Sequence, residues 1–175
     1  AFYLVKTDER NFITMLLTPG EKINLNSYYD SLNYPMSVTG SEGTELMNEY
    51  NRKLRNTIRK LSGLSNIYRQ NANNPQLPAV IESLDSMAQT YLDDMNSYTK
   101  SYIDKNLTSL VSLIALYQQV APNVYVLSPA KDYKYYIKVD SSLSLLYSDY
   151  EPVKTLHEQV QQLIAGVDTK EAKTA

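Results

Sequence analysis

Apolar residues recur at helical spacing over much of this chain. Between residues 45 and 70 they follow one another at steps of three and four, with basic residues between them, which predicts an amphipathic helix. Residues 77–102 alternate steps of four and three, the clearest pattern in the sequence, and predict a second helix that packs antiparallel on the first. Together the two segments predict a long αα-hairpin.

The stretch from Leu107 to Val120 is apolar on almost every side. A helix of this kind must be enclosed by other elements or lie in a membrane. Crossing a membrane takes about 20 apolar residues, and this stretch is shorter. We therefore expect no transmembrane segment here, but the central helix of a buried core, and we expect Leu113→Asp to unfold the domain.

Two more helices are expected in the C-terminal part of the chain. One covers residues 131–147, and the other begins near Glu151 and ends at Gly166. Residues 167–175 carry no apolar pattern, which is typical of a linker or a disordered tail.

The N-terminal residues are predicted to be extended. Phe2–Val5 and Phe12–Leu17 are rich in aromatic and β-branched residues, and the polar residues between them suit a hairpin. A turn at Thr18–Glu21 contains proline and glycine, and Lys22–Asn26 alternates like a half-buried strand. Three strands are few for an independent sheet, so we expect them to be the end of a larger β unit.

The predicted fold class is mainly α: a bundle of about five helices, including the long αα-hairpin, with a short N-terminal antiparallel β element. The predicted organisation assigns β strands to residues 1–26, a linker to 27–43, a helical domain to 44–166 and the tail to 167–175.

Charge and cysteine content exclude several classes of function. The formal net charge of −2 argues against a nucleic-acid surface, which normally carries a strongly basic face. The sequence contains no cysteine, which excludes disulfides, thiolate metal sites and thiol catalysis within this chain. The basic residues of the first long helix are interpreted as a solvated face rather than an anion site; they are Arg52, Lys53, Arg55, Arg59 and Lys60.

Residues that could carry catalysis are few. His157 is the only histidine, and its helical neighbours Lys154, Glu158 and Gln161 place it on or near a solvated face. The adjacent pair at 93–94 is acidic, but neighbouring helix positions point in different directions. We therefore predict no catalytic residue, no metal site and no cofactor, and no enzymatic activity of this chain by itself.

Tyrosine is the one residue type in unusual excess, at sixteen tyrosines against two phenylalanines and no tryptophan. Its apolar body and polar tip suit half-buried positions and binding surfaces alike. Tyrosines at the edge of a helical core are the simpler interpretation. Those of the predicted linker, Tyr28, Tyr29 and Tyr34, form a candidate interaction surface.

A series of short motifs, in a fixed order, resembles one bacterial family: Thr18–Glu21, Val38–Leu46, Ile103–Leu110, Ala115–Gln118 and Val153–Leu156. The family comprises Bacteroidetes cell-envelope proteins in which a β-rich region and a helical segment precede a TlpA/ResA-like thioredoxin domain. The likeness runs from about residue 2 to residue 165. The thioredoxin domain and its Cys-x-x-Cys pair are absent here, so no catalytic residue transfers to this chain.

The resemblance implies a non-catalytic accessory domain in the periplasm or cell envelope. It would position a thioredoxin-like redox domain, in the same polypeptide or in a partner, or hold the protein substrate of that domain. Two alternatives remain open. One is a stand-alone binding protein with a tyrosine-lined ligand groove, and the other is a structural module that forms a homodimer through residues 45–102.

Overall fold

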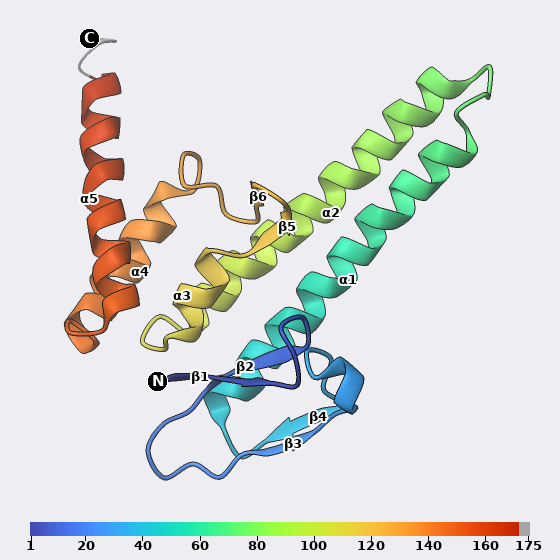
Figure 1. Cartoon of the computed structure of the whole chain (residues 1–175). Coiled ribbons are helices and arrows are strands. Elements are labelled where there is room, and N and C mark those ends of the chain that lie inside the picture. Colours follow the sequence, from blue (N-terminus) through green and yellow to red (C-terminus); the bar gives the residue numbers. More distant parts are fainter. Residues whose placement is uncertain (172–175) are drawn as a thin grey trace.

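The computed structural model describes residues 1–171 of the chain, and the side chains of residues 1–166. The fold is mainly α with a short N-terminal antiparallel β element, which confirms the predicted fold class. The described residues form five α-helices: α1 (Glu42–Gln70), α2 (Leu77–Lys105), α3 (Val111–Leu116), α4 (Tyr133–Leu146) and α5 (Glu151–Glu171). Figure 1 shows α1 and α2 as a long hairpin that projects away from the rest of the chain.

The N-terminal residues form two separate two-stranded sheets. Strands β1 (Phe2–Lys6) and β2 (Phe12–Leu16) pair as the antiparallel hairpin that the sequence predicts. Strand β3 (Asn24–Asn26) pairs instead with β4 (Ser37–Thr39), and a short 3-10 helix, η1 (Tyr29–Ser31), lies between them in sequence. The segment 27–43, assigned above to a linker, thus contains regular structure of its own.

A hydrogen-bond network joins the first β-hairpin to the start of α1. Ser41 precedes the helix in an extended conformation, and its Oγ accepts from the backbone N–H of Thr44, which caps the helix. The hydroxyls of Ser41 and Thr44 also donate to the carbonyl of Leu16, at 2.8 and 3.0 Å. Because all of these atoms are buried, the network fixes where β2 meets the helix.

The α1–α2 hairpin is confirmed, and its proximal half, nearest the β element, has a tyrosine-rich seam. The rings of Tyr50, Tyr98 and Tyr102 pack at tilted angles with centroids 4.9–6.1 Å apart. The Tyr50 hydroxyl also forms a hydrogen bond with Thr99 Oγ1 at 2.8 Å. Helix α1 runs without interruption through Gly63. One glycine costs about 1 kcal/mol of helix stability, less than the packing of so long a seam provides.

The predicted central segment is buried, but it is not one helix from Leu107 to Val120. Helix α3 covers only Val111–Leu116, turns precede it, and strand β5 (Gln119–Ala121) follows and pairs with β6 (Val124–Tyr125). The carbonyl of Gln118 accepts from the N–H of Val126, a non-local bond that replaces continued helix. The burial that the pattern indicates is confirmed: Leu113 and Leu116 are 4% and 0% exposed.

Helices α4 and α5 complete the core beside α3. Tyr136 of α4 is fully buried, and its hydroxyl donates to the carbonyls of Leu116 and Leu127, at 3.3 and 3.0 Å. The prediction that the last helix ends at Gly166 is wrong, because α5 continues to Glu171. A single glycine does not end a helix whose preceding turns pack on the core. The rest of the predicted tail, residues 172–175, lies outside the described residues.

Candidate functional site

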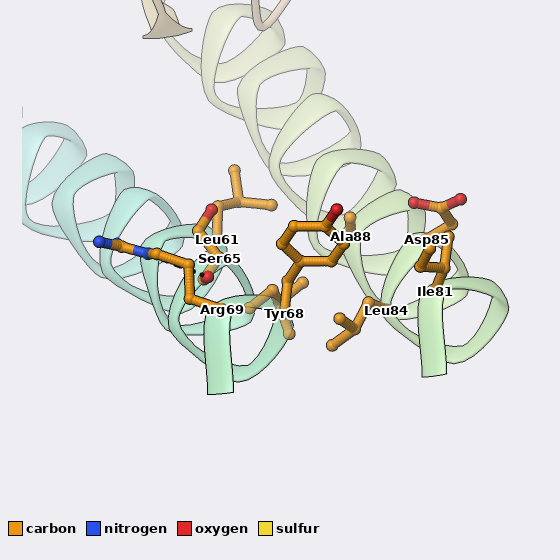
Figure 2. A pocket seen from close by; sticks show the side chains of 9 residues that line it. Leu61, Ser65, Tyr68, Arg69, Ile81, Leu84, Asp85 and Ala88 are labelled. Carbon is orange, nitrogen blue, oxygen red and sulfur yellow. Dashed lines mark hydrogen bonds between the residues drawn. The ribbon is translucent and has the colours of Figure 1, made fainter. Parts of the chain in front are cut away.

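Figure 1 shows no other described element over the outer half of the α1–α2 hairpin. This half carries an open groove, whose lining side chains are drawn in Figure 2. Its volume is about 530 Å³. We call it the distal groove, and define it by the residues that line it: Leu61, Leu64, Ser65, Tyr68 and Arg69 of α1, and Ile81, Leu84, Asp85 and Ala88 of α2.

The groove follows from the same apolar periodicity that forms the hairpin. Leu64 and Leu84 are 7% and 9% exposed and close its floor, while Tyr68 and Ile81 remain 46% and 36% exposed on its walls. Figure 2 shows the Tyr68 ring between the two helices. The helices therefore bury one row of apolar side chains between them and leave the next row open to solvent.

The distal groove continues the face on which the rest of the core packs. Ile81, Leu92 and Ile103 follow at steps of eleven residues, about three helical turns, so they lie nearly in line on α2. Ile103 is fully buried in the core cluster, which contains residues of α3, and Leu92 packs against the same cluster. Nearer the core, this face of α2 is covered by α3 and the segment that follows it. Farther out, the same face is open.

The two sides of the groove differ in charge. Arg69 lies on the α1 side and Asp85 on the α2 side, and Figure 2 shows their charged groups pointing away from each other. Arg69 donates only to its own helix, to the Ser65 carbonyl at 3.3 Å and to Asn66 Oδ1 at 2.8 Å. Among residues with described side chains, neither Arg69 nor Asp85 forms an ion pair.

Three of the basic residues of α1 interpreted above as a solvated face also lie over tyrosine rings. Lys53 covers Tyr98 and Lys60 covers Tyr91, with Nζ 5.5 and 4.9 Å from the ring centroids. The Arg55 guanidinium lies 4.8 Å from the centroid of Tyr34. Desolvation by burial lowers the pKa of Arg55.

The tyrosines proposed as an interaction surface do not line one site. Tyr28, Tyr29 and Tyr34 are 67%, 73% and 53% exposed. Tyr34 lines a surface hollow between the β1–β2 turn and η1, and the other two do not. The role of Tyr29 in the fold is carried by its backbone, because its carbonyl accepts from the side chain of Asn11.

His157 has a structural partner that sequence spacing did not identify. Its Nδ1 lies 2.9 Å from Oδ2 of Asp140, a residue of α4 that is only 5% exposed. A carboxylate can only accept, so the imidazole donates. The Ser144 hydroxyl donates to the other carboxylate oxygen at 2.8 Å. The His157 side chain is 52% exposed, as the sequence predicted, yet its inner nitrogen ties α5 to α4.

Several tyrosines are core residues rather than surface ones. Tyr50, Tyr102 and Tyr136 are 1%, 6% and 0% exposed. Burial raises the pKa of all three hydroxyls, because the ionised phenolate would lose its hydration, and raises the pKa of Tyr117 to about 12. These groups contribute to folding and offer no acid or base near neutral pH.

No cluster of three or more possible metal ligands occurs among the residues with described side chains. No helix in the described part of the chain is both long enough and apolar enough to cross a membrane. No protein-family model, curated protein or solved structure matches the chain.

Proposed function

We propose that this chain is a non-catalytic interaction domain that binds a helical segment of another protein in the distal groove. One observation carries the proposal: an open apolar groove lies between the two antiparallel helices of a hairpin that projects beyond the core. Grooves of this shape bind amphipathic helices, whose apolar residues at positions i, i+3, i+4 and i+7 fill the space between the supporting helices.

The exposed residues of the groove walls provide apolar surface for binding. Tyr68 and Ile81 are large side chains, and a bound helix would remove much of their remaining exposed apolar surface from water. Each Å² of apolar surface buried contributes about 25 cal/mol to association, offset by the entropy lost on binding. Because the helices that form the groove also pack on each other, the site needs little rearrangement before binding.

The family resemblance supplies the proposed setting. An accessory domain of a thioredoxin-like cell-envelope protein would hold the redox domain, or the substrate of that domain, by such a contact. The absence of cysteine from the sequence fits this division of roles, since this chain brings no thiol of its own.

A display library of helical peptides selected on the full chain tests the proposal. Ala88→Arg places a long charged side chain in the groove wall, while Ser86→Arg adds the same group at an exposed position outside the lining. We expect selected peptides to bind the unmodified chain and Ser86→Arg alike, and Ala88→Arg at least about tenfold more weakly. Peptides that bind all three proteins equally would contradict a groove function.

The thioredoxin setting has a separate test. If the gene continues beyond codon 175 into a domain with a Cys-x-x-Cys pair, that domain becomes the first partner to examine. A neighbouring sequence without any thioredoxin-like domain contradicts the redox setting and leaves the groove proposal unaffected.

A further inference from the structure

We infer that the helix bound in the distal groove carries opposite charges on its two flanks, acidic beside α1 and basic beside α2, so that only one direction of the helix fits. The inference rests on the proposed function and specifies its partner. It comes from the charge of the groove sides, the missing ion-pair partners there, and the way the chain covers the same face nearer the core.

The two arms of the hairpin carry opposite charge over most of their length. Between residues 50 and 70, α1 has only basic charged residues: Arg52, Lys53, Arg55, Arg59, Lys60 and Arg69. Between residues 77 and 99, α2 has only acidic ones: Glu82, Asp85, Asp93 and Asp94. Two of the basic residues, Lys53 and Lys60, reach over tyrosine rings of α2. The charges that a ligand in the groove meets are therefore those of the groove lining.

Two of these charges line the groove itself. We call Arg69 the basic rim and Asp85 the acidic rim. Neither forms an ion pair with a described side chain, and they point away from each other across the groove. Figure 2 shows both groups directed to the outer sides of the groove, so a bound helix would meet them with the side chains of its flanks. Arg69 would exchange its bonds to Ser65 and Asn66 for such a contact.

Nearer the core, where this face of α2 is covered, polar side chains at its edge contact the covering segment. There the Nδ2 of Asn96, on α2, donates to the Val126 carbonyl at 2.9 Å, and Lys100 pairs with Asp132 at 2.7 Å. The chain's own covering segment thus combines apolar burial with polar contacts to the edge of α2. We extend the same arrangement to the distal groove, with the covering segment supplied by a partner.

The groove sets the length and the direction of that segment. Leu61 to Arg69 covers eight residue steps, or about 12 Å, so a helix of about two turns fills it. Turning an amphipathic helix end for end, with its apolar face still in the groove, exchanges its two flanks. Oppositely charged rims therefore favour one direction, whereas uncharged or like-charged rims would not.

A second copy of this chain fits the charges less well. In a two-fold dimer with antiparallel hairpins, α1 lies on α1 and the basic arms face each other. In the parallel arrangement, α3 and the segment after it, which cover the same face as the groove, would meet their own copies. A separate helix avoids both conflicts.

The test uses three synthetic peptides of 18 residues with one leucine and alanine stripe. The first has glutamate on one flank and lysine on the other, the second glutamate on both flanks, and the third lysine on both. Binding to the full chain is measured by fluorescence anisotropy at low salt. We expect the first peptide to bind about fivefold more tightly than either of the others, and about 0.5 M salt to remove the difference.

The direction of the bound helix is determined by NMR. A paramagnetic label at the N-terminus of the first peptide broadens the signals of the protein's backbone amides that lie near it. The exchange variant Arg69→Glu/Asp85→Lys should keep the affinity but move the broadening to the opposite end of the groove. The neutral pair Arg69→Gln/Asp85→Asn should bind all three peptides about equally. Circular dichroism checks that both variants remain folded.

The possible failures are distinguishable. Equal affinity for the three peptides, or unchanged label position in the exchange variant, overturns the inference on charge and leaves a groove that binds helices. Sedimentation that shows a dimer from which the peptides are excluded also overturns it, in favour of a second copy. If no helical peptide, designed or selected, distinguishes the unmodified chain from Ala88→Arg, the proposed function fails as well.

Discussion

Some buried polar groups in this protein are satisfied by partners that lie far away in sequence, whereas the buried Tyr102 hydroxyl has no hydrogen-bond partner among the described residues. Asp140 accepts from His157, seventeen residues on, and the carbonyl of Leu16 accepts from two hydroxyls near the start of α1. Each of these hydrogen bonds joins two elements and involves a buried polar group. Removing one partner leaves the other unsatisfied, so it lowers the free energy of unfolding by more than the hydrogen bond itself contributes. Single hydrogen bonds between distant residues therefore help to fix the elements relative to one another.

Removing the His157 imidazole tests this. His157→Ala leaves the buried carboxylate of Asp140 with only the Ser144 hydroxyl, and we expect the free energy of unfolding to fall by about 1–3 kcal/mol. Lys154→Ala, on the same helix and exposed, should change it by less than about 0.5 kcal/mol. Urea unfolding measures both, and equal values for the two variants would show that the Asp140 contact does not stabilise the fold.

At the scale of elements, α3 contributes through burial rather than through length. It has six residues, far fewer than an isolated helix needs, and it is held by α1, α2 and α4 around it. The two long helices show the opposite case, since each is long enough to extend past its tertiary partners. The distal groove lies where that extension leaves the core.

Leu113→Asp should abolish cooperative folding. The variant loses a buried leucine, worth about 2–5 kcal/mol, and adds a carboxylate without a partner, against a total stability of about 5–15 kcal/mol. Leu145→Asp is the matched control, because Leu145 on α4 is 86% exposed while Leu113 is 4% exposed. Thermal unfolding followed by circular dichroism should show a transition only for the control; a cooperative transition in Leu113→Asp would contradict burial of α3.

At the scale of the whole molecule, the tyrosine excess is partly explained by the core. Three tyrosines are buried, and the pKa of each is raised above the ordinary value of 10 by burial. Because the folded-state pKa is the higher one, these groups stabilise the fold fully below pH 10 and progressively less as pH rises above it. The protein should therefore unfold in alkali.

We expect that unfolding to begin above pH 10, with the helical circular dichroism falling as tyrosinate absorbance rises. Tyr50→Phe removes one of the contributing groups and should make the free energy of unfolding less steeply dependent on pH in this range. Two results would contradict the burial of Tyr50, Tyr102 and Tyr136. One is a Tyr50→Phe variant whose free energy of unfolding depends on pH as steeply as before, and the other is a helical signal that persists after all sixteen tyrosines have ionised.

The sequence alone determined the class of fold and the long hairpin, because apolar periodicity depends only on local geometry and persists over many turns. It also determined that the segment 107–120 contributes to the core, where most residues from Leu110 to Leu116 are buried. It did not determine their conformation, because the bond between Gln118 and Val126 that replaces helix there is non-local. The partner of Asp140 and the pairing of β3 with β4 were missed for the same reason.

Tertiary structure also determined which part of the apolar face of α2 stays open as the distal groove. Ile81 and Ile103 occupy equivalent positions of one apolar pattern, yet Ile103 is covered by the core and Ile81 is 36% exposed. Periodicity shows which face of a helix is apolar, but not how far along it the neighbouring elements reach. That extent depends on the lengths and placement of α3 to β6, and it leaves the outer half of the hairpin open.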